Sequence, residues 1–162
     1  MSTTPASLLS LTEIESRDGA YYGRSTCNLQ WRNFLGSLAI ELHLGSEGRE
    51  VRNFLRAVGR RMAGSMPLPK VETLGELEAE MNKVWMEIDW GWVRLGARDD
   101  KIWIVHGAYP NALSEGEDEI WPRGASAVLE GVYTIWFGAQ GSPGVRTVRI
   151  SERIRPLEFQ HG

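Results

Sequence analysis

The fold of this chain is set mainly by two short stretches: Met81-Asn-Lys-Val-Trp-Met-Glu-Ile-Asp-Trp-Gly-Trp-Val93 and Leu129-Glu-Gly-Val-Tyr-Thr-Ile-Trp-Phe137. Both are rich in aromatic residues, and within the first the apolar spacing changes from a helical period to the alternation of a strand. Neither stretch contains a Ser/His/Asp, Cys/His or metal-ligand grouping. The pattern therefore predicts that these aromatic side chains build a core and interfaces.

Length and charge narrow the class of protein. A chain of 162 residues fits one domain that buries about two-thirds of its unfolded surface. Its net charge of −3 argues against a general nucleic-acid binder, because phosphate recognition usually needs a basic excess. The single Cys27 excludes an intrachain disulfide framework and favours a reducing compartment. With no secretory signal and no membrane-spanning apolar run, we expect a soluble cytoplasmic protein without membrane insertion.

Helical periodicity outward from the two stretches predicts about four helices. They cover residues 29–44, residues 46–62 with Ser46 as the cap, a helix opened by the capping box Thr73-Leu-Gly-Glu76, and residues 121–139. The apolar stripe of each helix is expected to face the core.

Strand-like alternation predicts a small sheet. Residues 90–95 and 101–106 form a hairpin that turns at Arg98-Asp-Asp-Lys101, and residues 145–150 form a last strand. The predicted fold is α+β, with about four helices packed on a small, mostly antiparallel sheet in a single domain.

The predicted domain covers residues 29–151. Residues 1–28 are expected to form a flexible N-terminal arm, because Ser, Thr, Pro and Gly dominate there. Tyr21 and Tyr22 lie in this arm beside glycines, and we consider both a frayed terminus and an arm that orders on assembly. The tail, residues 152–162, is expected to be weakly ordered.

The polar residues suggest no reaction centre. His43, His106 and His161 lie on different predicted elements, and no zinc spacing or acid–base pair can be read from the chain. At a strand end, His106 is interpreted as a surface or hydrogen-bonded structural histidine. We therefore predict no enzyme activity, no cofactor and no metal.

Tryptophans and arginines give the interface candidates. Trp31, Trp85 and Trp136 stand at helical stripe positions and are assigned to the core. Trp90 and Trp92 are predicted to share one sheet face, with Trp103 on the other strand of the hairpin; all three suit a core or an oligomer interface.

Arg52, Arg56 and Arg60 form a charged stripe on the second predicted helix. Two interpretations remain: a solvated face, or an interface with the acidic residues 111–119 of a neighbouring subunit.

Several motifs, in common order and spacing, connect the chain to a known family. They are Glu50-Val-Arg-Asn53, Val58-Gly-Arg-Arg-Met-Ala-Gly64, Ile88-Asp-Trp-Gly-Trp-Val-Arg-Leu95, Ile104-Val-His106 and Val128-Leu-Glu-Gly-Val-Tyr133. Through them the chain resembles the cellulose synthase operon protein D family, a small component of the bacterial cellulose synthase complex, from about Trp31 to Ile150.

The resemblance implies a non-catalytic accessory subunit. Such proteins form octameric rings built from dimers and are thought to arrange cellulose-synthesising complexes or guide glucan chains, so that fibrils crystallise well. It implies self-association, partners within the synthase complex and contact with nascent glucan, and it adds no catalytic residues. Family N-terminal segments are thought to line internal passages, which makes Tyr21 and Tyr22 candidates for contact with glucan. The alternative function is a glucan-binding module that uses exposed tryptophans.

Overall fold

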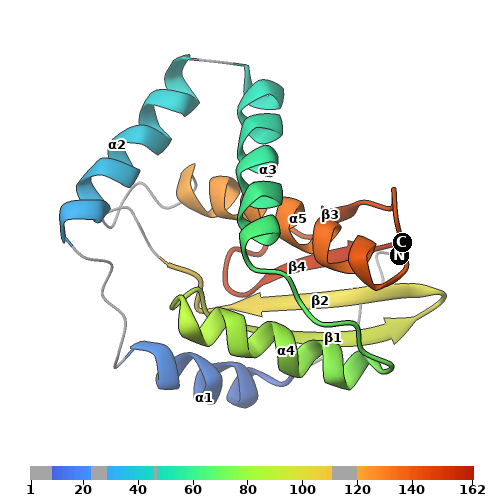
Figure 1. The fold of residues 1–162 in the computed structure, drawn as a ribbon. Helices are drawn as coiled ribbons and strands as arrows, with labels where there is room; N and C mark the ends of the chain where they lie inside the picture. The colour runs from blue at the N-terminus through green and yellow to red at the C-terminus, as the bar shows by residue number, and fades with distance from the viewer. Residues whose placement is uncertain (1–8, 23–28, 46, 111–119) are drawn as a thin grey trace, which may run out of the picture.

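A computed structural model describes residues 9–22, 29–45, 47–110 and 120–162. These residues form five helices and one four-stranded sheet: α1 Leu11–Tyr22, α2 Leu29–Gly45, α3 Gly48–Ser65, α4 Leu74–Glu87, β1 Trp92–Arg98, β2 Lys101–Gly107, α5 Ile120–Gln140, β3 Thr147–Arg149 and β4 Leu157–His161 (Figure 1). The predicted α+β class is confirmed, with one helix more than predicted.

Local sequence signals explain where several elements begin. The predicted capping box opens α4: the Thr73 hydroxyl accepts from the Glu76 backbone N–H, and the Glu76 side chain accepts from the Thr73 N–H. Helix α3 begins at Gly48 with Glu47 at its N-cap, so the predicted cap at Ser46 was misplaced by one residue; Ser46 itself lies outside the described residues.

The sheet has the strand order β1-β2-β4-β3, and every neighbouring pair is antiparallel. Strands β1 and β2 form the predicted hairpin, with Arg98 paired to Lys101. Asp99 and Asp100 have positive φ values of 51° and 60°. Two successive residues with positive φ form the tight hairpin turn whose twist matches that of the flanking strands.

The prediction of a weakly ordered tail was wrong. Strand β4 lies inside the sheet between β2 and β3, with Leu157 and Phe159 fully buried. The buried residues alternate over only five positions, a signal too short to stand out beside the charged residues that precede it. Tertiary pairing, which supplies hydrogen bonds on both sides, makes this short segment a strand.

The prediction of a flexible arm also fails for residues 9–22. Helix α1 lies below the sheet, on the side away from α3 and α5 (Figure 1). Leu9 and Ile14 are buried there against Trp92 and Val105, so this segment has a small core of its own. Residues 1–8 and 23–28 lie outside the described residues.

The main core lies on the opposite face of the sheet. Helices α4 and α5 supply most of its buried side chains, and α3 crosses α5. At this crossing, a Cβ on Gly59 would lie 1.9 Å from the Val128 carbonyl oxygen, and one on Gly131 would lie 2.2 Å from that of Arg56. The two helices can approach this closely only because both positions lack a side chain.

The free edge of β1 is closed by side chains of α4. The Asn82 amide donates to the Val93 carbonyl at 2.9 Å, and its oxygen accepts from the Val93 N–H at 2.8 Å. A Glu78 carboxylate oxygen accepts from the Leu95 N–H at 2.8 Å. These side chains take the place of a neighbouring strand, which protects an edge that would otherwise pair with another chain.

Candidate functional site

Aromatic side chains of α4, β2 and α5 meet at the centre of the molecule. Trp85 packs against Trp136, with ring centroids 4.9 Å apart, and against His106 edge-on at 5.1 Å. Tyr133 joins the same cluster, and all four side chains are buried. The predicted core role of Trp85 and Trp136 is confirmed.

The sequence left two interpretations of His106, a surface histidine or a hydrogen-bonded structural histidine, and the structure shows the second. Its Nε2 donates to the Trp90 carbonyl at 2.7 Å, and its Nδ1 accepts from the Tyr133 hydroxyl at 2.5 Å. Burial lowers the pKa of His106 to about 4, although the hydrogen bond to Trp90 acts in the opposite direction. Burial raises the pKa of Tyr133, so both groups are neutral at pH 7 and serve as a polar link inside the core.

The described residues contain no group of three or more His, Cys, Asp and Glu side chains placed to hold a metal ion. In the same part of the chain, no helix is long and apolar enough to span a bilayer.

The arginine stripe has a partner within the chain. Arg56 Nε lies 2.6 Å and Arg52 Nη2 lies 3.0 Å from the two carboxylate oxygens of Glu130 on α5. Glu130 is only 1% exposed, whereas Arg60 is exposed. Arg52 and Arg56 thus join α3 to α5, and of the three predicted interface arginines only Arg60 stays exposed without an ion pair to Glu130.

Sequence reasoning missed Glu130, although one signal was present: a single carboxylate inside the apolar run Leu129-Glu-Gly-Val132. The same carboxylate accepts from the Arg149 N–H at 2.9 Å, and the Thr134 hydroxyl accepts from the Thr147 N–H at 3.0 Å. Side chains of α5 therefore close the β3 edge of the sheet as those of α4 close the β1 edge.

Trp90 and Trp92 do not share a sheet face, which corrects the prediction. Trp90 precedes β1 and stacks on Trp85 in the main core, with centroids 6.2 Å apart. Trp92 is buried under α1, where its indole N–H donates to Asp18 at 2.7 Å and Arg17 lies over its ring. The backbone reverses between them at Gly91, whose φ of 98° and close approach to the Gly107 carbonyl allow no side chain.

The seven tryptophans differ widely in exposure. Trp31 is 55% exposed on α2, which contradicts its predicted place in the core. Trp90 and Trp103 are half-buried, and the remaining four are buried. If the protein binds a ligand through tryptophans at its surface, only Trp31, Trp90 and Trp103 are accessible enough to take part.

Tyr21 and Tyr22 lie in the last turn of α1, and their side chains fall outside the described residues. The acidic residues 111–119, the predicted partner of the arginine stripe, also lie outside them.

A groove of about 790 Å³ lies between α2, α3 and the start of α5. Leu35, Leu42, Val51, Leu55 and Val58 line its walls. Arg52 and Arg149 stand among its polar lining residues. Helix α2 reaches away from the sheet (Figure 1) and meets the rest of the fold mainly at α5 and α3.

Large apolar side chains are exposed on the two helices that wall this groove, and Leu38 and Phe54 also line it. Phe34 is 58% exposed and Leu38 40% exposed on α2, and Phe54 is 53% exposed on α3. Their helical spacing predicted a buried stripe. The groove and the exposed residues Trp31, Phe34, Leu38 and Phe54 together form what we call the α2–α3 face.

Comparisons with known proteins identify the family of the chain. The family model for the D subunit of cellulose synthase matches residues 18–161. A protein named "Cellulose synthase operon protein D" from Komagataeibacter xylinus is 39% identical over 112 residues, which cover 66% of this chain and 69% of the relative. Its namesake from Komagataeibacter sucrofermentans matches to the same extent. The chain belongs to the cellulose synthase operon protein D family.

Proposed function

We propose that this protein is a non-catalytic accessory subunit that assembles with itself into a scaffold for cellulose synthesis. The assembly is a ring-like oligomer, an octamer built from dimers, that works beside the inner membrane in the cytoplasm. It organises synthases or guides glucan chains into ordered crystalline fibrils, together with other proteins of the synthase complex. A ring repeats identical weak sites, so multivalency holds complexes in rows without one strong contact.

The observation that carries the proposal is the exposure of the α2–α3 face. Soluble monomers rarely leave a contiguous apolar patch of this kind in water, and such patches mark interaction sites. Trp31, Phe34 and Leu38 are exposed on one helix, and Leu38 lines the groove together with Phe54 of α3.

The shape of this face favours a second copy of the chain as its occupant. It presents projecting aromatic side chains and an apolar hollow within the same surface. In a two-fold symmetric interface each subunit offers the same patch to the other, so a surface with both features is complementary to itself. Dimers formed in this way supply the first step of ring assembly.

The direct test is the absolute mass in solution, by light scattering on a sizing column across protein concentrations. We expect a stable species near eight times the chain mass of 18.2 kDa. Phe34→Glu should shift it to smaller species, because a charge would be buried unpaired in the interface. Met86→Glu is the matched control, since Met86 is 55% exposed on α4, away from this face.

Salt separates the two possible kinds of interface. An apolar interface keeps its mass at high salt, whereas pairing between Arg60 and the acidic residues 111–119 of a neighbour weakens as charges are screened. Charge reversal at Arg52 or Arg56 would not distinguish them, because both hold Glu130 within the chain. A monomer at every concentration would remove the scaffold mechanism, as would a gene disruption that leaves cellulose yield, fibril alignment and crystallinity unchanged.

A further inference from the structure

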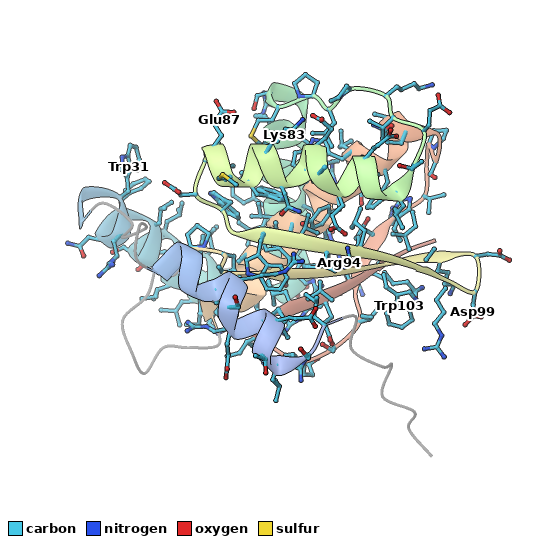
Figure 2. The ribbon with its side chains drawn as sticks, turned by 90° about the horizontal axis from the view of Figure 1, so that it is seen from below. Trp31, Lys83, Glu87, Arg94, Asp99 and Trp103 are labelled. Carbon is cyan, nitrogen blue, oxygen red and sulfur yellow. The ribbon has the colours of Figure 1, made fainter. Side chains whose placement is uncertain are left out.

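The described residues cover only part of the outer face of the sheet, opposite the main core. Strand register places Trp92 on this face at one end and Trp103 nearer the hairpin tip. Helix α1 covers the end with Trp92 and Val105. Seen from below, the α1 ribbon does not pass in front of Trp103, which lies toward Asp99 at the hairpin tip (Figure 2).

Trp103 stands in a row with small or polar neighbours. Its partner on β1 is Gly96, which has no side chain, and its partner on β4 is Gln160. On the far side of Gln160 follows Val148, 40% exposed. The half-buried indole is therefore anchored in the sheet, and its partner Gly96 has no side chain that could stack against it.

The next row of the same face supplies hydrogen-bonding groups. Arg94 is exposed and pairs with Glu78, with Nη1 and Oε1 3.0 Å apart. Glu158 lies across Val105 on β4, where Arg153 stands 3.6 Å from its carboxylate. Both charged side chains are held in place by a partner, so they can meet a ligand without a large loss of side-chain entropy.

We propose that Trp103 is the stacking platform of a sugar-binding site that takes a segment of β-1,4-linked glucan. In such a glucan the ring hydroxyls are equatorial, which leaves both faces of each ring as flat patches of C–H groups. These patches stack on an indole, and the hydroxyls at the ring edge meet Gln160, Arg94 and Glu158. The choice of a β-linked glucan rests on the proposed function.

The composition of this face favours a sugar over a protein partner. Protein interfaces have a continuous apolar centre that is depleted of charge, and the α2–α3 face has that character. Here a single aromatic side chain is surrounded by an amide and charged groups. Trp31 does not suit the same role, because it packs edge-on against Phe34, with centroids 6.1 Å apart, on the α2–α3 face.

The test is a titration of the full-length protein with cellohexaose by calorimetry, supported by pull-down on crystalline cellulose. We expect Trp103→Ala to weaken binding at least about tenfold, as truncation of an aromatic anchor does. Trp103→Phe should keep part of the affinity, and Gln160→Leu should weaken it without loss of the apolar platform. Met86→Ala is the control, because Met86 is 55% exposed on α4 and belongs to neither proposed surface, and it should bind as the unmodified protein does.

The results of these experiments distinguish a failure of the proposed glucan site from a failure of the proposed assembly. The α-linked maltohexaose should bind more weakly, because its curved chain does not lie flat on the sheet. If Trp103→Ala melts at the same temperature and still binds cellohexaose like the unmodified chain, the site is overturned. It is also overturned if the unmodified protein forms the oligomer yet binds no cellohexaose. Loss of binding in Trp103→Ala at an unchanged oligomer mass supports the site independently of assembly.

Discussion

At the scale of single residues, Glu130 makes several contacts at once. One buried carboxylate holds two guanidinium groups of α3 and the Arg149 N–H at the edge of the sheet. An interior carboxylate is unfavourable unless it is paired and hydrogen-bonded, and here both oxygens have donors. Glu130 therefore fixes how α3, α5 and β3 meet.

Replacing Glu130 should reduce the free energy of unfolding measured in urea. Glu130→Leu leaves the Arg149 N–H without its acceptor and is expected to cost about 2–3 kcal/mol. This lies below the usual cost of breaking a buried pair, because Arg52 and Arg56 can turn to solvent. Glu130→Gln should cost less, since its amide oxygen still accepts. Glu80→Gln, which breaks an exposed pair with Lys83, should change little; equal effects for Glu130→Leu and Glu80→Gln would contradict the assignment.

His106 makes stability depend on pH. Its pKa is about 4 in the folded protein, below the 6.5 of an ordinary histidine, so the unfolded chain binds the proton more readily. The contribution of His106 to the free energy of unfolding is therefore fully present above pH 6.5. It is lost as the pH is lowered toward 4, by up to about 3 kcal/mol. Urea midpoints across this range measure the effect.

Single substitutions distinguish the contribution of His106 to this pH dependence from the contributions of the other histidines. His106→Gln should flatten most of the pH dependence, although His161, whose pKa burial also lowers, leaves a smaller slope. His43 is exposed on α2, so His43→Gln should keep the full slope. An unchanged slope in His106→Gln would show that another group carries it.

At the scale of elements, helices α4 and α5 complete the sheet at both edges while they cover its inner face. Asn82 bonds to the N–H and C=O of Val93 on one edge, and Glu130 and Thr134 accept the N–H groups of β3 on the other. Periodicity predicted α4 and α5, because their apolar stripes are long. It could not predict the edge contacts, since those depend on which strands are outermost.

Removal of β4 should prevent the chain from folding. A chain that ends at Arg155 loses Leu157 and Phe159 from the core, each worth about 2–5 kcal/mol, out of a total stability of about 5–15 kcal/mol. It also leaves β2 and β3 without the strand between them. We expect no cooperative thermal transition by circular dichroism. A chain that lacks only the exposed Gly162 is the control, and a normal melt of the shorter chain would contradict the central role of β4.

At the scale of the whole molecule, the two faces of the sheet have different tasks. The inner face, with α4 and α5, forms the aromatic core. The outer face is divided between α1, which covers Trp92, and the half-buried Trp103. The α2–α3 face stands apart from both and carries exposed apolar side chains. Assembly and contact with glucan are thus proposed on separate surfaces, so each can be tested without loss of the other.

Elements whose signals are local could be predicted from the amino-acid sequence. The capping box at Thr73, the Asp99–Asp100 turn and the aromatic stripes of α4 and α5 depend on residues close together in the chain. The family could likewise be recognised from the order of short motifs.

Contacts between residues that are distant in the sequence, and the exposure of side chains, were decided only by the tertiary structure. The fold placed the short segment 157–161 inside the sheet and gave Arg52 and Arg56 a partner in Glu130. It also left Trp31, Phe34 and Leu38 of the apolar stripe of α2 exposed, whereas Leu35 packs against the core. Helical spacing shows that one face is apolar, but not whether the same chain covers it. Pairing, burial and exposure depend on residues that are distant in sequence, and no local pattern contains them.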